Sequence, residues 1–372
     1  MDKYSKLKLR PSVAIVAKSE YTEFFLSNIR KSIILKIDPS VSDYLFELDG
    51  SQTLSKWLAK KELTSKEEQS FFELLSFLNS NSILIDMDVL YDESYKTYPR
   101  IFTLLEDYLE SQSQVLKAFN KIRKSKVMIV GLGSVGNWVV QSLAMSGVNK
   151  FVLVDPDKVD ISNLHRQVGF KESDEGSSKV SVMTTRLKEI RPEIKIESFE
   201  DWLDDDFLKK GNISDIDLII NCADFPTVDE TSKIVGEYAM ENKINHIIGG
   251  GYNLHQSLIG QVVIPDKTAC VECFRLNLDE INEIDTSNIY KLNNVTRKVG
   301  SFPPLSALSA SITANEAFKS LAGLKNIIMS NSRTEFMMRE QNFSNLLMNR
   351  RSDCNWCGYE GKYYQLSRDK DK

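Results

Sequence analysis

The sequence has few of the residues that carry protons in catalysis or form disulfide bonds. Its 372 residues include three histidines and five cysteines. The histidines, His165, His246 and His255, do not converge on a metal triad or a Ser-His-Asp arrangement, so we assign them no chemistry. Four of the five cysteines form two C-x-x-C pairs, which in a reducing compartment indicate a metal site before disulfides.

Basic stripes and long apolar runs are also missing. The chain has 47 Lys and Arg against 52 Asp and Glu, a net charge of −5 and a pI near 5.5. A nucleic acid is not expected as the main partner, because binding phosphates requires a basic face. No segment reaches the ~20 apolar residues of a membrane helix, and residues 1–10 lack the apolar core of a signal peptide. We expect a cytoplasmic protein that binds neither membrane nor nucleic acid.

A glycine-rich segment is the clearest motif that is present. The apolar run Val127–Val130 leads into Gly131, Gly133 and Gly136, and a helix-like segment follows. Gly131 permits a tight turn, Gly133 lets a phosphate approach the backbone, and Gly136 lets the helix pack closely on the strand. A second apolar run ends at Asp155, which is placed to accept hydrogen bonds from a ribose. The pattern predicts a nucleotide site with the phosphate at the helix N-terminus.

Polar residues further along favour a triphosphate over a dinucleotide. Asn163, Arg166 and Gln167 follow the ribose aspartate, and Lys179 opens the next helix. Their amide, guanidinium and ammonium groups suit phosphate oxygens, so an NAD-dependent oxidoreductase is disfavoured. Asp224 stands where another apolar strand meets a loop, on the rim at which open α/β sheets bind ligands. The alternative role for Asp224 is to cap the following helix.

Four short motifs together resemble a known family. Gly-Leu-Gly-Ser-Val-Gly, Asn-Leu-His-Arg-Gln, Gly-x-x-Lys and Asn-Cys-Ala-Asp are similar to the adenylating domain shared by ThiF, MoeB and the ubiquitin-activating enzymes. The resemblance implies an α/β fold with a Rossmann-like, mostly parallel sheet, ATP as substrate, Mg²⁺ held by Asp224, and a homodimer. The implied catalytic residues are Arg166, Lys179, Asp224 and Arg100, the last acting in the other subunit unless it is an ordinary surface arginine. The implied nucleotide-binding residues are Gly131, Gly133, Gly136, Asp155, Asn163, Arg166, Gln167 and Lys179.

The cysteine pairs predict one metal ion. Cys270 and Cys273 form the first pair, and Cys354 and Cys357 form the second. Two-residue spacing lets both thiolates of a pair meet one tetrahedral ion, and a fully thiolate set leaves no open position for water. We therefore expect a structural zinc; the alternative is two redox pairs without metal. Cys222, the fifth cysteine, is expected to pack at the end of a strand and not to act as a nucleophile.

The N-terminal residues predict a separate small domain without a phosphate loop. Short strands at 13–16, 24–26 and 33–37 precede helices, the second of which opens with the capping-box pair Thr64 and Glu67. Residues 1–92 resemble the winged-helix, PqqD-like α+β domains that capture peptides by adding them to a sheet edge. A DNA-binding winged helix and a dimerisation arm are the alternatives. Residues 93–372 would form the adenylating domain with its four-cysteine zinc site.

The order of the motifs resembles the microcin C adenylating, or MccB-type, subgroup. This resemblance implies ATP-dependent adenylation of the C-terminus of a short ribosomally made peptide in the biosynthesis of an antibiotic such as microcin C or a bacteriocin. Two other functions stay open. One is a sulfur-carrier-protein adenylyltransferase of the ThiF or MoeB type. The other is a non-catalytic protein that presents a leader peptide to a modifying enzyme.

Overall fold

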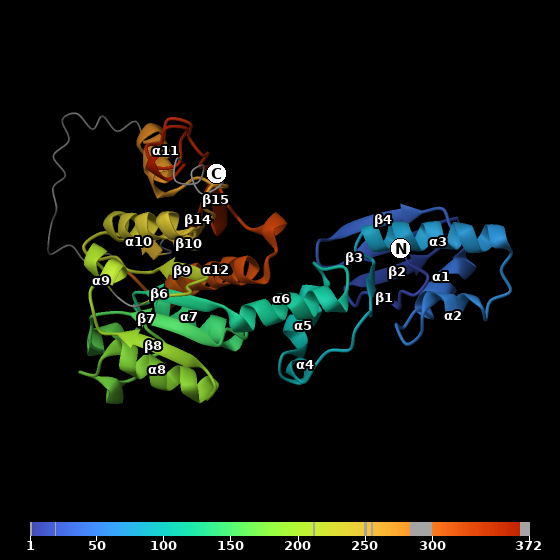
Figure 1. The fold of residues 1–372 in the computed structure, drawn as a ribbon, viewed down its shortest axis with the longest axis horizontal. Coiled ribbons are helices and arrows are strands. Elements are labelled where there is room, and N and C mark those ends of the chain that lie inside the picture. Colours follow the sequence, from blue (N-terminus) through green and yellow to red (C-terminus); the bar gives the residue numbers. More distant parts are fainter. Residues whose placement is uncertain are drawn as a thin grey trace. The chain divides into compact units, whose positions relative to one another are not determined.

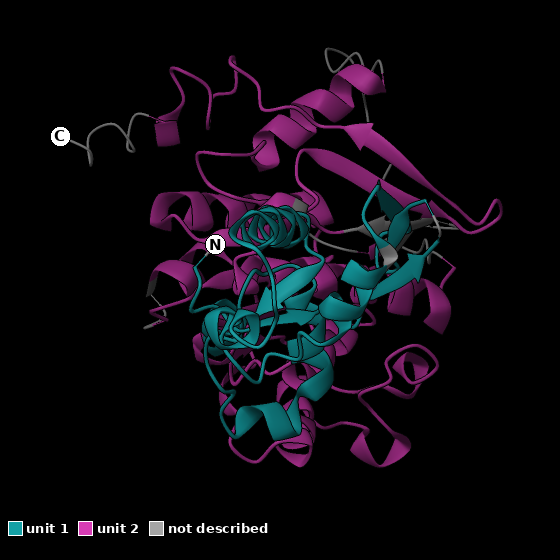
Figure 2. Cartoon of the chain, turned by 90° about the vertical axis from the view of Figure 1, so that its right-hand side faces the viewer, with its two compact units in different colours: residues 1–120 teal, residues 121–372 magenta. Residues whose placement is uncertain are grey.

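The structure is a computed structural model that describes residues 2–18, 20–210, 213–248, 251–253, 256–282 and 300–364. The chain forms two compact units, residues 1–120 and 121–372 (Figure 2). His255 and residues 283–299 of the segment that follows the first cysteine pair lie outside the described residues. Within the part that is described, no helix is long and apolar enough to cross a membrane.

The first unit is an α+β unit with two small antiparallel sheets (Figure 1). One sheet has the strand order β2-β3-β4, and the other pairs β1 with β5. Its elements are β1 (Leu7–Leu9), β2 (Val13–Ala17), β3 (Thr22–Leu26), β4 (Lys31–Leu35), α1 (Pro39–Phe46), α2 (Leu54–Leu58), α3 (Ser65–Ser80), β5 (Leu84–Asp86), α4 (Ser94–Thr97), α5 (Pro99–Glu106) and α6 (Gln112–Lys124).

Helix α3 begins where the sequence predicts. Thr64 accepts a hydrogen bond from the Glu67 N–H, and the Glu67 side chain accepts one from the Thr64 N–H, so the capping box is confirmed. The apolar face of the helix buries Phe71 in the core of the unit, where its ring stacks on Trp57 at a centroid distance of 5.3 Å. Packing of this face, more than helix propensity, holds α3 in place.

Strand β4 ends earlier than the predicted strand 33–37. It spans Lys31–Leu35 and pairs with β3. The register explains the difference, because Leu35 pairs with Thr22, the first residue of β3, so the ladder ends before Lys36. Asp38 then caps α1, since its carboxylate accepts a hydrogen bond from the Ser40 N–H.

Residues 93–120 belong to the first compact unit. Buried Arg10 explains the attachment, because its Nε donates to the Leu84 carbonyl at 2.9 Å and its Nη2 donates to the Leu109 carbonyl at 2.8 Å. One guanidinium thus joins strand β5 to the segment between α5 and α6. The functional division at residues 92 and 93 stays a prediction.

The second unit is α/β. Its elements are β6 (Lys126–Val130), α7 (Gly136–Met145), β7 (Lys150–Val154), η1 (Ile161–Asn163), η2 (Glu172–Asp174), α8 (Lys179–Ile190), β8 (Lys195–Phe199), α9 (Asp205–Lys210), β9 (Leu218–Asn221), α10 (Val228–Asn242), β10 (Asn245–Ile248), β11 (Gly251–Asn253), β12 (Gln256–Ile259), β13 (Gln261–Val263), α11 (Val271–Ile281), α12 (Pro303–Ala322), η3 (Lys325–Ile327), β14 (Ser332–Met337) and β15 (Asn342–Leu347).

The main sheet has the order β13-β10-β9-β6-β7-β8, and all of its pairs are parallel except β10 with β13. This confirms the predicted α/β fold with a mostly parallel sheet. The central strand β6 is apolar and buried from Val127 to Val130, because helices cover both faces of such a sheet. A second sheet, β11-β12-β14-β15, is antiparallel.

One titratable group is sealed inside this unit. His246 on β10 has no exposed surface, and its Nδ1 lies 3.2 Å from the Ile244 carbonyl. Its Nε2 has no hydrogen-bond partner among the described residues. Burial lowers the pKa of His246 to about 4, because the charged imidazolium would lose its hydration.

We predict that the fold loses stability in mild acid. The folded-state pKa lies below the ordinary value of 6.5, so the unfolded chain binds the proton first as the pH falls. The contribution of neutral His246 is complete above pH 6.5 and is lost between pH 6.5 and 4, up to about 3 kcal/mol. Urea unfolding at several pH values should show this fall in the free energy of unfolding, a slope against pH, in the wild type and in His165→Gln. His246→Leu should lack this part of the slope; the same slope in all three proteins would contradict the prediction.

Candidate active site

The candidate site lies where the strand order of the main sheet reverses. Strand β6 is paired on one side with β7 and on the other with β9. The chain first adds β7 and β8 on one side of β6 and later adds β9 and β10 on the other side. Loops from the carboxyl ends of β6 and β9 therefore leave in opposite directions and open a crevice, which is where open α/β sheets bind ligands. The glycine loop after β6 and Asp224 after β9 both lie at this edge.

The glycines of the loop are required by close backbone contacts. Gly131 has φ +85°, and a Cβ built on it would lie 2.8 Å from the Ala223 nitrogen. A Cβ on Gly136 would lie 1.9 Å from the Gly131 carbonyl oxygen. A Cβ on Gly133 would meet no atom within 4 Å, so the backbone there faces open space. This geometry fits the roles predicted for the three glycines.

Asp155 holds the glycine loop in place. Its Oδ2 accepts a hydrogen bond from the Leu132 N–H at 2.6 Å, and its Oδ1 accepts one from the Asp157 N–H at 2.9 Å. Only 4% of the residue is exposed. Burial raises the pKa of the Asp155 carboxyl, and the positive charge of Lys179 acts in the opposite direction. Its predicted contact with a ribose stays a prediction, and the described role is to position the loop.

Lys179 is the first residue of α8 and is also buried. Its ammonium donates to Asp157 at 2.7 Å, and only 5% of its side chain is exposed. A buried ammonium needs an anionic partner, and Asp157 supplies one. The Asp157 side chain is itself 56% exposed. Lys179 is thus oriented toward the carboxyl edge of the sheet by a residue that the sequence did not single out for a role.

The predicted phosphate-binding residues Asn163, Arg166 and Gln167 lie in and after η1. Arg166 is half-buried, and its Nη1 donates to the Ser162 carbonyl at 2.9 Å. Gln167 is 3% exposed, and its Oε1 has no hydrogen-bond partner among the described residues. An unpaired buried amide is costly unless a further group binds it, so this geometry suits a polar ligand.

Asp224 is exposed at the end of β9 and does not cap the following helix. The cap of α10 is Thr227, whose side chain accepts from the Glu230 N–H at 3.1 Å. The loop is fixed by buried Asn221, which donates to Thr231 at 3.0 Å. The capping alternative for Asp224 is therefore wrong, and its carboxylate faces solvent at the crevice. Arg100 is exposed on α5 in the first unit.

The sequence profile of the ThiF family matches residues 110–356, well over half of the chain. The chain belongs to the ThiF family. This confirms the superfamily that the four short motifs predict.

Two curated relatives show the same similarity. The tRNA threonylcarbamoyladenosine dehydratase of Haemophilus influenzae is 33% identical over 135 residues, which cover 35% of this chain and 49% of that protein. The adenylyltransferase and sulfurtransferase UBA4 of Lodderomyces elongisporus is 35% identical over 113 residues, 30% of this chain and 25% of that protein. This chain spans half or less of the length of these relatives.

A solved structure extends the similarity to the first unit. E. coli MccB, crystallised with AMPCPP and selenomethionine MccA, has a TM-score of 0.74 and 23% identity, over 95% of this chain and 99% of that chain. Another MccB structure, described as the microcin C7 biosynthetic enzyme with N-formylated MccA, has a TM-score of 0.72 and 21% identity over the same shares. The likeness shows that this ThiF-family chain has the MccB fold over nearly its whole length.

Asn137 is a site residue of this ThiF-family chain that sequence reasoning missed. It is fully buried on α7, its Nδ2 donates to the Gly133 carbonyl at 2.7 Å, and its Oδ1 accepts from the Gly169 N–H at 3.4 Å. One amide thus joins the glycine loop to the segment that follows Arg166 and Gln167. The signal in the sequence was an asparagine in the first turn of a mostly apolar helix, directly after the last glycine of the loop.

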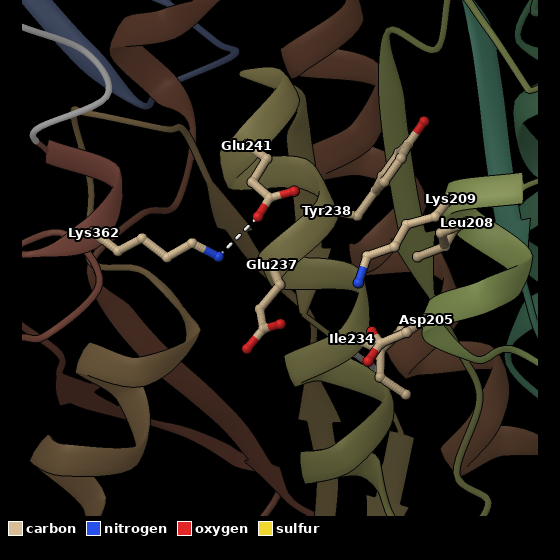
Figure 3. A pocket seen from close by; sticks show the side chains of 8 residues that line it. All are labelled: Asp205, Leu208, Lys209, Ile234, Glu237, Tyr238, Glu241 and Lys362. Carbon is tan, nitrogen blue, oxygen red and sulfur yellow. Dashed lines mark hydrogen bonds and ion pairs between the residues drawn. The ribbon is translucent and has the colours of Figure 1, made fainter. Parts of the chain in front are cut away.

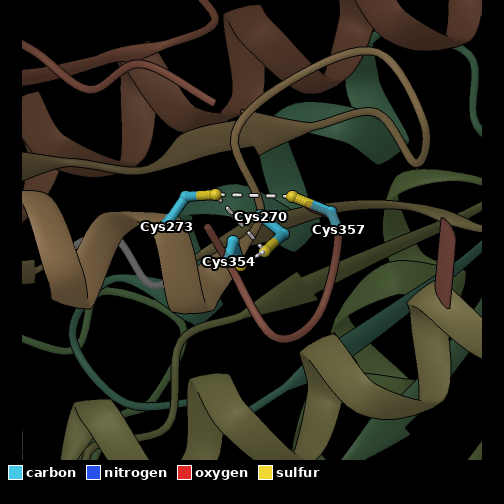
Figure 4. A group of neighbouring side chains, drawn as sticks. All are labelled: Cys270, Cys273, Cys354 and Cys357. Atoms are coloured by element: carbon cyan, nitrogen blue, oxygen red, sulfur yellow. Dashed lines mark hydrogen bonds between the residues drawn. The ribbon is translucent and has the colours of Figure 1, made fainter. Parts of the chain in front are cut away.

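The four predicted metal ligands of the ThiF-family unit come together (Figure 4). Cys270 Sγ lies 3.8 Å from Cys273 Sγ and 3.6 Å from Cys354 Sγ, and Cys273 Sγ lies 3.3 Å from Cys357 Sγ. A tetrahedral zinc with bonds of about 2.3 Å places its sulfurs about 3.8 Å apart, whereas a disulfide requires about 2.05 Å. The donor set therefore fits zinc.

A charged pocket lies away from the candidate site (Figure 3). Three acidic residues and two lysines from α9, α10 and the C-terminal segment line it, and Lys362 pairs with Glu241 at 2.8 Å. Glu241 is in the last turn of α10, which starts at the carboxyl edge of the sheet and runs back. The pocket therefore lies along α9 and α10, and none of its lining residues belongs to the glycine loop.

We predict opposite behaviour for two glycine variants. Gly136→Ala should lower the free energy of unfolding by about 2 kcal/mol or more, because its methyl group collides with a backbone oxygen. Gly133→Ala should unfold like the wild type, since nothing lies within 4 Å, but should weaken nucleotide binding if a phosphate occupies that space. Urea unfolding and calorimetric titration with ATP measure the two effects. Equal stability of both variants would contradict the prediction, because it would show that a methyl group at position 136 is tolerated.

Proposed function

We propose that this protein adenylates the C-terminus of a short ribosomally made peptide, with ATP as the nucleotide donor, in the biosynthesis of a peptide antibiotic of the microcin C type. The observation that carries the proposal is the combination of the ThiF-family match with a first compact unit, most of which precedes that match. The same pair of units is present in MccB, which was crystallised with AMPCPP and MccA.

The nucleotide side of the reaction uses the residues of the crevice. The open backbone at Gly133 and the N-terminus of α7 would receive a phosphate. Asn163, Arg166 and Gln167 approach from η1, and Lys179 approaches from α8. A triphosphate would compete with Asp157 for the ammonium of Lys179. Asp224 is the residue that would hold Mg²⁺, which neutralises phosphate charge when bound.

The proposed chemistry is nucleotidyl transfer. An oxygen of the C-terminal carboxylate, or an amide nitrogen, attacks the α-phosphorus of ATP. The new bond to phosphorus forms as the bond to the bridging oxygen breaks, and pyrophosphate leaves with that electron pair. The chain stabilises the added negative charge through Lys179 and Arg166. A carboxylate nucleophile needs no general base.

The peptide side is assigned to the sheet of the first unit. Strand β4 is an edge strand of β2-β3-β4, so one of its sides is open to a further strand. The outward face of the sheet carries apolar side chains: Val16 is 43% exposed and Ile34 is 59% exposed. Val16 and Ile34 lie on the same face, on either side of Glu23. Exposed apolar side chains mark interaction surfaces, and a strand added beside β4 would lie next to Ile34.

A homodimer is part of the proposal. Strand β15 leaves Phe343 51% exposed and Leu347 67% exposed, which is apolar surface that a second copy would cover. In a homodimer Arg100 would reach the triphosphate of the partner subunit. We also propose that the four cysteines hold one structural zinc in the reducing cytoplasm, since a site filled by four thiolates has no open position for catalysis.

The first test concerns the crevice. Asp224→Asn should lower peptide-dependent exchange of labelled pyrophosphate into ATP by ~100-fold or more, because it removes the charge proposed to hold Mg²⁺. The matched control is Asp229→Asn, an exposed carboxylate in the first turn of α10, which should exchange normally. Mass spectrometry of the peptide encoded beside the gene should show a gain of one nucleotide.

Three outcomes would refute parts of this proposal. Normal exchange by Asp224→Asn would remove the magnesium assignment. Exchange driven by a protein tail ending in Gly-Gly, and not by a peptide, would favour a sulfur-carrier adenylyltransferase. Wild-type protein that binds peptide but never exchanges pyrophosphate would favour a non-catalytic leader-presenting partner.

The second test concerns zinc. Protein purified under reducing conditions should contain about one zinc per chain, and Cys354→Ser should lose the metal and unfold more easily, because metal binding contributes to folding. Cys222→Ser is the control: its thiol lies under the glycine loop, where burial raises the pKa to about 12, and it should keep the zinc. Metal-free wild type of unchanged stability would refute the assignment.

A further inference from the structure

Two exposed aromatic rings touch at the edge of the crevice. Trp202 and Phe225 have centroids 5.0 Å apart and ring planes at 49°. Trp202 is 51% exposed and Phe225 is 64% exposed. Single exposed aromatics are common, but two that contact each other and still show half their surface to water expose a continuous apolar patch.

The topology shows what this contact spans. Trp202 follows β8 and Phe225 follows β9, and β7 and β6 lie between these two strands in the sheet. Three strand spacings amount to about 14 Å. The rings meet across this distance because the segment after β8 turns back over the sheet toward α10. Its helix α9 places Leu208 in one hydrophobic core with Val235 of α10 and Val152 of β7.

A continuous chain of contacts links the rings to the nucleotide crevice. The Asp155 N–H donates to the Phe199 carbonyl at 3.1 Å, three residues before Trp202. Asp155 Oδ2 accepts from Leu132 at 2.6 Å, and a Cβ on the neighbouring Gly131 would lie 2.8 Å from the nitrogen of Ala223. Ala223 stands two residues before Phe225. Both rings thus follow, within three residues, backbone that contacts Asp155 or the glycine loop.

Charge decides which part of a nucleotide this patch suits. The loop around Trp202 is acidic and exposed, with Glu200, Asp201 and Asp204. Carboxylates repel a triphosphate, whose cationic partners Arg166 and Lys179 follow β7 instead. A flat, uncharged ring with exocyclic N–H donors meets both features of the patch, since it stacks on aromatic faces and can donate to carboxylates.

We infer that Trp202 and Phe225 form an aromatic wall that stacks against the purine base of the nucleotide. This inference rests on the proposed function, because it places the base of the ATP that the crevice would bind. Trp202 supplies the larger face, and Phe225 holds it across the gap. The wall adds affinity for the base and leaves the affinity for the phosphates unchanged.

Tryptophan fluorescence tests the wall directly. The chain has four tryptophans: Trp57 and Trp356 are buried, Trp138 is half-buried in the first turn of α7, and Trp202 is 51% exposed, so Trp202 is the one most open to a stacked base. ATP should quench the wild-type signal, whereas inorganic triphosphate should not. Trp202→Phe should lose the quench and keep most of the affinity for ATP in calorimetric titration. Trp202→Ala and Phe225→Ala should weaken ATP binding about 10-fold and leave triphosphate binding unchanged.

Phe46→Ala is the matched control, because it removes an aromatic ring that is 61% exposed at the end of α1 in the first unit. It should bind ATP as the wild type does. If Trp202→Ala and Phe225→Ala keep full ATP affinity while the wild type binds ATP and exchanges pyrophosphate, the wall is refuted and the proposed function stands. If the wild type binds neither ATP nor triphosphate, both are refuted.

Discussion

The site depends on one steric constraint, the contact between the loops that follow β6 and β9. Gly131 and Gly136 leave no room for a Cβ, because the Ala223 backbone and the Gly131 carbonyl occupy that space. This contact brings the start of α7 against the end of β9 and so fixes the distance between the helix N-terminus and Asp224. Gly131 and Gly136 let the backbone turn tightly, and within this turn the backbone at Gly133 faces open space.

Buried polar groups hold the rest of the site against this contact. Asp155 fixes the loop through Leu132, Asn137 joins it to Gly169, and Asp157 keeps Lys179 in place. Asp155, Asn137 and Lys179 are almost free of water, so their hydrogen bonds have few competitors and leaving one of these groups unpaired would be costly, whereas Asp157 is partly exposed. The residues proposed to touch the nucleotide are thus carried on a scaffold whose own charges are already balanced.

The two units contribute different surfaces. The second unit carries the glycine loop and the residues proposed to bind phosphates, whereas the first has an edge strand and exposed apolar side chains on its sheet but no phosphate loop among its described residues. A sheet edge recognises the backbone of an extended chain, and a helix N-terminus recognises an anion. This division of tasks suits a reaction between a peptide and a nucleotide better than a reaction between two small molecules.

The sequence alone determined the strand, turn and helix around the glycine fingerprint, the capping box at Thr64 and the pairing of the cysteines. These are local patterns, in which period, spacing and special backbone angles involve residues that are near in sequence. Only the tertiary structure decided that Thr227 and not Asp224 caps α10, that Asp157 pairs with Lys179, and that Trp202 meets Phe225. Those relations join residues on different strands and loops, and the packing of α9 and α10 on the sheet sets their distances. No pattern along the chain carries that information.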